Sequence, residues 1–102
     1  MSLAVQRHVA PLDVERIRAD FPILDRQVRG RRLAYLDSAA TAQKPLVVVD
    51  AIRDFYLTSN ANIARSVHQL GEEATAAYER TREVVRRFVN AESADEVVFT
   101  AG

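Results

Sequence analysis

The chain has 102 residues and a mass of 11.4 kDa, which is enough for a single domain near the lower end of the usual size range. Apolar residues make up 48% and charged residues 27%, a composition typical of globular chains and not of disordered ones. Fourteen basic and fourteen acidic side chains cancel, which disfavours general nucleic-acid binding, and no apolar run is long enough to span a bilayer. The absence of cysteine excludes disulfides, thiolate metal sites and a thiol nucleophile on this chain, and it is compatible with the cytoplasmic location that we expect.

The N-terminal part contains one short predicted helix. Residues 1–12 show no hydrophobic period and no helix cap, so we expect a flexible tail. Asp13 is a suitable cap for a helix over Val14–Asp20. Pro22 ends this helix, because the residue before a proline is displaced from helical angles, and residues 21–24 are expected to run extended.

A turn and a short strand are expected next. The charged stretch 28–32 contains Gly30, which predicts a turn. Residues 33–36 are predicted to form a strand, and the small and polar residues 37–41 close it. On composition alone, residues 37–41 fit an ordinary exit from a strand into a loop.

The second predicted helix covers Leu46–Ser59. Pro45 suits the first turn of a helix, where no amide donor is needed. Asn60 and Asn62 are expected to end the helix, because asparagine tolerates left-handed angles. One apolar stripe supports the helix, formed by Val48, Ile52, Phe55 and Tyr56.

The third predicted helix has the clearest signals. Ser66 and Gln69 have the spacing of a capping box, and apolar residues then repeat at three- and four-residue steps from Leu70 to Val89. The charged residues are expected to form a solvated face. The expected ion pairs join Glu79 to Arg82, and Glu83 to Arg86 and Arg87.

A turn over Asn90–Asp95 and a buried strand over Glu96–Thr100 complete the prediction. Two strands are too few for an independent sheet, so we expect an α/β segment with an incomplete sheet. Ligands of open α/β proteins bind in the loops that follow the strands, and the sequence stops where such a loop begins. These features indicate a fragment whose remaining strands lie beyond Gly102.

Four segments resemble a known enzyme family. The first is Tyr35-Leu36-Asp37-Ser38-Ala39-Ala40-Thr41-Ala42-Gln43-Lys44-Pro45, which is similar to the N-terminal signature of SUF-type (group II) cysteine desulfurases, within the class V aminotransferase-like enzymes. Asp20–Leu24, Asn62–Leu70 and Glu96–Gly102 resemble further segments of the same family in the same order. The similarity covers residues 13–102, which we interpret as the N-terminal segment of a desulfurase-like domain.

The resemblance implies the fold of the aspartate-aminotransferase type (fold type I) and a pyridoxal 5′-phosphate (PLP) cofactor bound as a lysine Schiff base. It implies a homodimer that converts L-cysteine to L-alanine and an enzyme persulfide, whose sulfur passes to an acceptor protein for iron–sulfur cluster assembly. Gly102 aligns with the glycine that opens the family's phosphate loop. The cofactor lysine and the persulfide cysteine of the family belong downstream, so we expect this chain to be inactive alone and to contain no catalytic residue.

Five residues are candidate site residues by this resemblance. Ala39, Ala40 and Thr41 are expected to form part of the wall of the cofactor and substrate pocket, where small side chains leave room for a planar ring. Arg65 and His68 are expected near the active-site entrance.

The sequence departs from the family pattern beside the last two candidates. Ala64 replaces a common histidine and Ser66 replaces a common glycine, which puts a polar role of that loop in doubt. Lys44, the only lysine, is expected to be a surface residue. No metal site is expected, because His8 and His68 are far apart in the sequence and no cysteine accompanies them.

Two alternative interpretations remain open. Related class V enzymes with the same N-terminal pattern act as selenocysteine lyases or amino-acid epimerases, and the residues that decide between them lie downstream. The other alternative is a non-catalytic interaction module, or a stand-alone small protein that pairs with a second chain supplying the missing sheet. Two apolar stripes support this interpretation, because they need packing against other apolar groups. One lies on the second predicted helix, and the other is formed by Tyr78, Val85 and Phe88.

Overall fold

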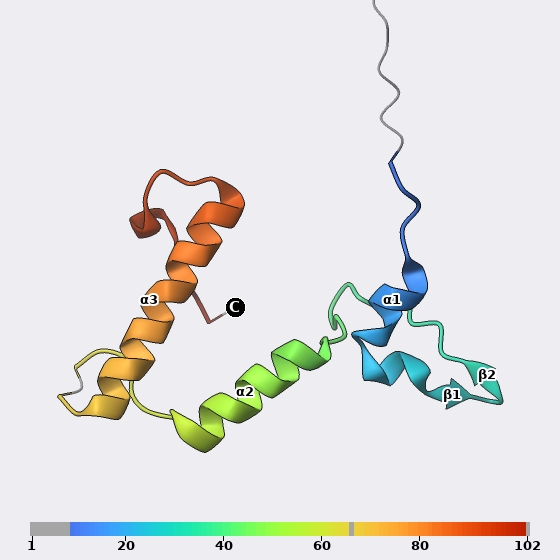
Figure 1. The fold of residues 1–102 in the computed structure, drawn as a ribbon, viewed down its shortest axis with the longest axis horizontal. Helices are drawn as coiled ribbons and strands as arrows, with labels where there is room; N and C mark the ends of the chain where they lie inside the picture. Colours follow the sequence, from blue (N-terminus) through green and yellow to red (C-terminus); the bar gives the residue numbers. More distant parts are fainter. Residues whose placement is uncertain (1–8, 66, 102) are drawn as a thin grey trace, which may run out of the picture. The chain divides into compact units, whose positions relative to one another are not determined.

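The computed structural model describes residues 9–65 and 67–101 (Figure 1). The chain divides into two compact units, residues 1–51 and 52–102, and each is described by itself. Ser66 of the predicted capping box, His8 and Gly102 lie outside the described residues, as do the first eight residues of the predicted tail.

The first helix forms as predicted. Helix α1 covers Val14–Ala19, and the Asp13 side chain accepts a hydrogen bond from the Arg16 amide at 3.0 Å. The expected extended run over residues 21–24 is wrong, because Pro22–Asp25 forms a 3-10 helix, η1. Proline at the first helical position has a suitable φ and needs no amide partner, so it starts the new turn.

The turn at Gly30 is confirmed as the tip of a small hairpin. Strand β1 (Gln27–Val28) pairs antiparallel with strand β2 (Arg31–Arg32), with Val28 opposite Arg31. The two residues between the strands, Arg29 and Gly30, have φ of 53° and 73°. Positive φ at both central residues is what a tight two-residue hairpin requires.

The predicted strand over residues 33–36 is wrong, because this segment runs irregularly after β2. Leu33, the first residue of this segment, makes hydrogen bonds to two arginine residues instead. The Leu33 amide donates to the Arg26 carbonyl at 3.0 Å, and the Leu33 carbonyl accepts from the Arg18 guanidinium at 3.0 Å. A strand exists only beside a partner strand, and no described segment pairs with residues 33–36.

Helix α2 covers Leu46–Thr58 and confirms the second predicted helix. The Pro45 carbonyl accepts the Val48 and Val49 amides, which starts the helix directly after the proline. The predicted left-handed angles at Asn60 and Asn62 are wrong.

Helix α3 covers Gln69–Val89 and confirms the third predicted helix. Its cap differs from the prediction, because His68 is the N-cap and its ring nitrogen accepts the Gly71 amide. At the other end Asn90 adopts the left-handed conformation (φ 56°), and the Ala91 amide donates to the Arg86 carbonyl at 3.0 Å. This closure confirms the predicted turn after the helix.

The segment after α3 contains a short 3-10 helix, η2 (Ala94–Glu96). A capping box starts it: the Ser93 side chain accepts the Asp95 amide, and the Glu96 carboxylate accepts the Ser93 amide. The predicted strand over Glu96–Thr100 is wrong, because Glu96 belongs to η2 and residues 97–99 pair with no strand among the described residues.

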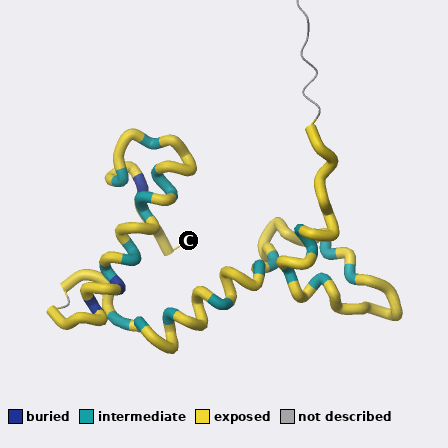
Figure 2. Tube along the Cα trace, in the orientation of Figure 1, coloured by how far each residue is buried: buried dark blue, intermediate teal, exposed yellow. Residues whose placement is uncertain are grey.

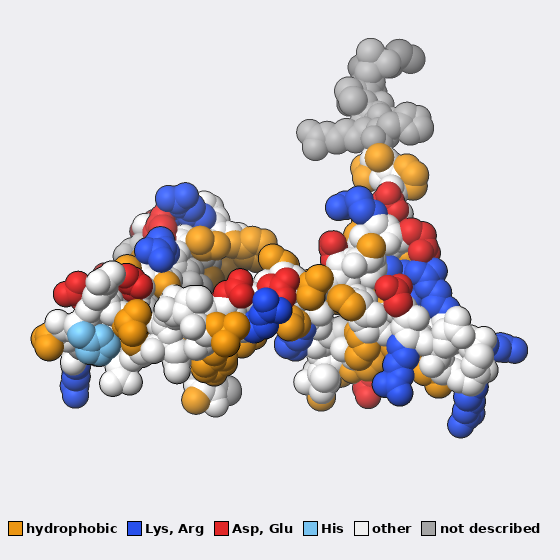
Figure 3. Space-filling view, turned by 60° about the horizontal axis from the view of Figure 1, so that its bottom comes forward, with side chains coloured by type: hydrophobic (Ala, Val, Ile, Leu, Met, Phe, Trp, Pro, Cys, Tyr) orange, Lys and Arg blue, Asp and Glu red, His pale blue; other side chains and the backbone are white. Residues whose placement is uncertain are grey.

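Few side chains are buried (Figure 2). Among the described hydrophobic residues only Ala74 and Val97 are buried, with exposed fractions of 2% and 8%. Many large apolar side chains face solvent, including Phe88 on α3 and Tyr56 on α2, and Figure 3 shows hydrophobic groups at the surface of both units. Each unit therefore leaves a large part of its apolar surface exposed to solvent.

The charged face of α3 forms as predicted. Arg82 pairs with Glu79 at 3.1 Å, and Glu83 pairs with Arg86 at 2.8 Å and Arg87 at 2.9 Å. Hydrogen bonds from Arg86 and then Arg87 lower the pKa of the Glu83 carboxyl from its ordinary value of 4.5 to about 2. A lowered pKa in the folded chain means that ionised Glu83 stabilises the last turns of α3.

This contribution should depend on pH in one direction. It is present above the unfolded pKa of 4.5 and disappears as the pH falls toward about 2, because protonation removes the acceptor for both arginines. The measurement is a titration of the Glu83 carboxyl carbon by NMR, with helix content followed in parallel. The variant Glu83→Gln should lack this pH-dependent component, and a Glu83 midpoint at 4.5 or above would contradict the assignment.

Candidate functional site

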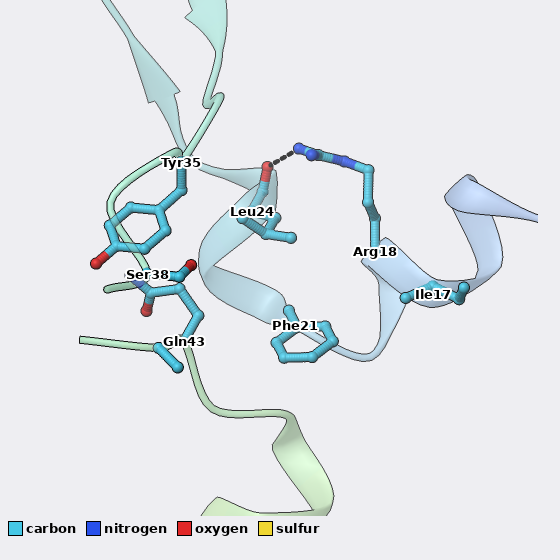
Figure 4. Close-up of a pocket in the computed structure, with 8 residues that line it drawn as sticks. Ile17, Arg18, Phe21, Leu24, Tyr35, Ser38 and Gln43 are labelled. Atoms are coloured by element: carbon cyan, nitrogen blue, oxygen red, sulfur yellow. Dashed lines mark hydrogen bonds between the residues drawn. The ribbon is translucent and has the colours of Figure 1, made fainter. Parts of the chain in front are cut away.

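The first unit contains a cavity of about 340 Å³ beneath the loop that follows β2 (Figure 4). Helix α1 and η1 supply one part of its lining, and the loop supplies the other. In Figure 4, Tyr35, Ser38 and Gln43 lie toward one side and Arg18 and Ile17 toward the other. The lining residues are Ile17, Arg18, Phe21, Leu24, Tyr35, Ser38, Ala42 and Gln43.

Tyr35 holds this loop in place. Its hydroxyl lies 2.8 Å from the Asp37 carbonyl and also within hydrogen-bond distance of the Thr41 carbonyl. One phenolic proton is thus shared between two carbonyls that bracket residues 38–40. These two hydrogen bonds hold residues 38–40 in a turn beside the cavity.

The predicted pocket-wall residues lie at this turn. Ala39, Ala40 and Thr41 are all exposed, and the cavity is lined instead by their neighbours Ser38 and Ala42. The alanines therefore present small side chains outward from a loop that Tyr35 closes. Whether they contact a cofactor in a longer protein stays a prediction.

Arg18 is a structural residue that the sequence analysis did not identify. One terminal nitrogen donates to the carbonyls of Leu24 and Leu33, at 3.1 and 3.0 Å. Its Nε atom is buried and has no hydrogen-bond partner among the described residues. No local motif signals this role, because Leu33 is 15 residues away in sequence.

The second candidate group lies in the other unit, in the loop before α3. Ala64 and Arg65 adopt left-handed angles, with φ of 60° and 53°. The Ala64 amide donates to the Thr75 hydroxyl at 2.9 Å, and that hydroxyl donates to the Gly71 carbonyl at 2.8 Å. The Thr75 side chain thus ties the loop to the first turns of α3, and the Arg65 side chain is exposed.

His68 follows this loop as the N-cap of α3. Its Nδ1 atom accepts the Gly71 amide at 3.2 Å. Histidine is an uncommon cap, whereas the spacing of Ser66 and Gln69 is the usual sequence signal for one. Arg65 and His68 are therefore brought together on one loop, in a different unit from residues 39–41.

The remaining candidates show ordinary surface chemistry. Lys44 is exposed, and its Nζ atom donates to the Ala42 carbonyl at 2.7 Å, as expected for a surface lysine. Within the described ranges, no group of three metal-ligating side chains comes together. None of the helices described here has the length and apolarity needed to cross a membrane.

Comparison with known proteins defines the class of this chain. Residues 34–102 match the family model described as aminotransferase class-V. That range contains the loop that Tyr35 closes, helices α2 and α3, and the segment after α3. The chain belongs to the class-V aminotransferase family.

Three relatives show which members of the family the chain is similar to. The chain is 60% identical over 90 residues to a protein of Streptomyces coelicolor named "Probable cysteine desulfurase". It is 52% identical over 90 residues to a Staphylococcus aureus protein and 48% identical over 91 residues to a Halalkalibacterium halodurans protein, both of the same name. The alignments cover 87–89% of this chain but only 22% of each relative, so the chain spans about a fifth of their length.

The family implies the type I fold of the aspartate aminotransferases, of which the described residues contain helices and one small hairpin.

Removal of the His68 ring should loosen the start of α3. The variant His68→Ala loses the acceptor for the Gly71 amide, and loss of a side-chain cap costs about 1 kcal/mol. Hydrogen exchange at the Gly71 amide should accelerate about fivefold, while the exposed neighbour variant Val67→Ala should leave it unchanged. Equal exchange in both variants would show that His68 does not cap the helix.

Proposed function

We propose that this chain is the N-terminal segment of a PLP-dependent cysteine desulfurase. The observation that carries the proposal is the 60% identity over 90 residues to the Streptomyces coelicolor protein of that name. Two further relatives with the same name support it at 52% and 48% identity. The match extends over both units, since it covers 87% of the chain.

The complete protein, on this proposal, converts L-cysteine to L-alanine and leaves the sulfur on the enzyme as a persulfide. PLP supplies the electron sink for this chemistry, and the protein supplies binding and orientation. The persulfide sulfur passes to an acceptor protein for iron–sulfur cluster assembly, and the enzyme works as a cytoplasmic homodimer. These properties are proposed for the whole protein and not for the chain alone.

The described residues do not fit PLP by themselves. A Schiff-base lysine needs a lowered pKa, which burial or a neighbouring cation provides. The only lysine of the chain, Lys44, is exposed and bonds to a carbonyl of its own loop. We therefore propose that the chain is inactive alone.

Two groups of residues are proposed to border the active site of the complete protein. Ala39, Ala40 and Thr41 form a wall of the cofactor and substrate pocket. Support comes from their exposure on a loop that Tyr35 closes, which offers small side chains on a fixed backbone. Arg65 and His68 lie near the entrance, on a loop that Thr75 ties to α3.

The isolated chain should fail to bind PLP as a Schiff base. After incubation with PLP and removal of excess cofactor, it should show no visible band of a lysine-bound cofactor and release no sulfide from L-cysteine. The matched control is Lys44→Arg, which keeps the charge but cannot form the imine. A visible band in the natural chain that disappears in Lys44→Arg would overturn the proposal of inactivity.

The functional proposal is tested with a chimera. Residues 13–102 replace the matched segment of the Streptomyces coelicolor relative, and alanine and sulfide formation from L-cysteine are measured with PLP present. The chimera should be active. Ala40→Leu should lower kcat/KM at least about fivefold, because added methylenes in a packed wall cost roughly 1–3 kcal/mol, whereas Ala40→Ser should retain activity.

A chimera that folds and binds PLP but forms neither alanine nor sulfide from L-cysteine would contradict the proposal. Equal activity of Ala40→Leu and the unchanged chimera would remove residue 40 from the pocket wall.

A further inference from the structure

The hairpin of β1 and β2 concentrates positive charge that the proposed function does not use. Residues 26–32 contain four arginines and no acidic residue. All four arginines are exposed, and Figure 3 shows Lys and Arg side chains projecting into solvent from the unit that contains the hairpin. The hairpin precedes residues 34–102, the range that matches the family model, so the family match assigns it no role.

One arginine of the hairpin already holds a carboxylate. The two terminal nitrogens of Arg32 donate to the two carboxylate oxygens of Glu15, at 2.9 and 2.7 Å. A planar guanidinium matches a carboxylate in this two-bond geometry, which the ammonium group of lysine does not reproduce. The ion pair therefore illustrates the ligand chemistry that the other hairpin arginines offer.

The other three arginines have no such partner. Within the described chain, no ion pair or side-chain hydrogen bond involves Arg26, Arg29 or Arg31. Val28 lies opposite Arg31 in the hairpin register, so the two share one face, and Arg32 lies on the other. Arg26 is extended (φ −61°, ψ 140°) and two positions before Val28, which places it on the face of Arg31. Two unpaired guanidinium groups thus share a face, and the third lies at the adjoining tip.

Arg29 occupies the tip of the hairpin against the local preference of the backbone. Its φ is 53°, and that of Gly30 is 73°. A two-residue turn with positive φ at both positions favours Asn-Gly, Asp-Gly or Gly-Gly, because left-handed angles crowd the Cβ atom of other residues. An arginine at this position is therefore less stable than an asparagine. Backbone strain of this kind is concentrated at functional sites.

The charge around the hairpin favours an acidic protein segment over a nucleic acid as the ligand. Residues 9–51 contain seven basic and six acidic side chains, so the two signs nearly balance in this unit. A nucleic acid needs an extended basic surface, because its affinity is a sum over many phosphate contacts. Three neighbouring guanidinium groups fit a few carboxylates on a short segment instead.

We propose that Arg26, Arg29 and Arg31, the arginine cluster, form a docking site for an acidic segment of a partner protein. The guanidinium groups bind carboxylates of that segment with paired hydrogen bonds, as in the existing ion pair of the hairpin. Val28, which is 45% exposed on the same face, offers an apolar contact beside them. Docking at this cluster is independent of the proposed function, because none of the residues proposed to border the active site takes part.

The test measures binding of a fluorescein-labelled octaglutamate peptide to the full 102-residue chain by fluorescence anisotropy at low ionic strength. The triple variant Arg26→Gln/Arg29→Asn/Arg31→Gln should bind the peptide about tenfold more weakly, because exposed charge pairs each contribute a small share. Arg31→Lys, which keeps the charge but loses the planar fork, should weaken binding about threefold.

The single variant Arg29→Asn separates docking from folding. Hydrogen exchange at the amides of β1 and β2 should slow about twofold or more, because asparagine suits the left-handed angle. Binding of the peptide should nevertheless weaken about threefold. The matched control is Arg80→Gln, which removes one charge from an exposed arginine of α3 that has no ion pair among the described residues, and it should leave both quantities unchanged.

Several results would overturn the proposal. The first is equal binding of the peptide by the natural chain and the triple variant, and the second is equal weakening by Arg80→Gln and Arg29→Asn. Tighter binding of an oligothymidylate of equal charge, or of vesicles that contain phosphatidylserine, would assign the cluster to phosphate groups instead. The chimera of residues 13–102 with the Streptomyces coelicolor relative should bind the peptide with the same dependence on Arg29. Loss of that dependence would show that the rest of the polypeptide covers the cluster.

Discussion

Hydrogen bonds from arginine side chains to backbone carbonyls hold the two segments that have no neighbouring strand among the described residues. In the first unit Arg18 joins the carbonyls of Leu24 and Leu33. In the second unit Arg82 joins the carbonyls of Ala94 and Val97. Charged donors make stronger hydrogen bonds than neutral ones, and the planar guanidinium reaches two acceptors at once. Each arginine thus fixes a segment whose sequence is typical of a strand.

The helices could be predicted because their signals are local. Asp13, Pro45 and Asn90 mark helix ends through bonds to residues within a few positions, and the structure confirms all three helices. The predictions of strands over residues 33–36 and 96–100 were wrong. A strand depends on a partner strand that can come from anywhere in a protein, and no described segment pairs with these residues. The Ser93–Glu96 capping box has the same four-residue signature as the predicted one and was missed.

The site could be predicted only in part. The segment at residues 37–41 was identified through family resemblance, and the structure adds the physical reason for its shape, which is the shared hydroxyl of Tyr35. Arg18 lines the cavity and donates a hydrogen bond to the carbonyl of Leu33. The two residues are 15 positions apart in the sequence, so no local motif predicts this bond. His68 was expected at an entrance and is also a helix cap, so its position is set by α3. The family match then supports the function that neither the cavity nor the loop identifies alone.

The proposal that this chain is the leading part of a larger α/β enzyme accounts for both the exposed apolar side chains and the unpaired segment after η2. The most direct measurement is a crystal structure of the polypeptide that joins residues 13–102 to the rest of the Streptomyces coelicolor relative, with PLP bound. The account predicts that the rest of the polypeptide covers the exposed side chain of Val98 and that residues 39–41 lie beside the cofactor. A structure in which Val98 stays in solvent and residues 39–41 lie away from the cofactor would contradict it.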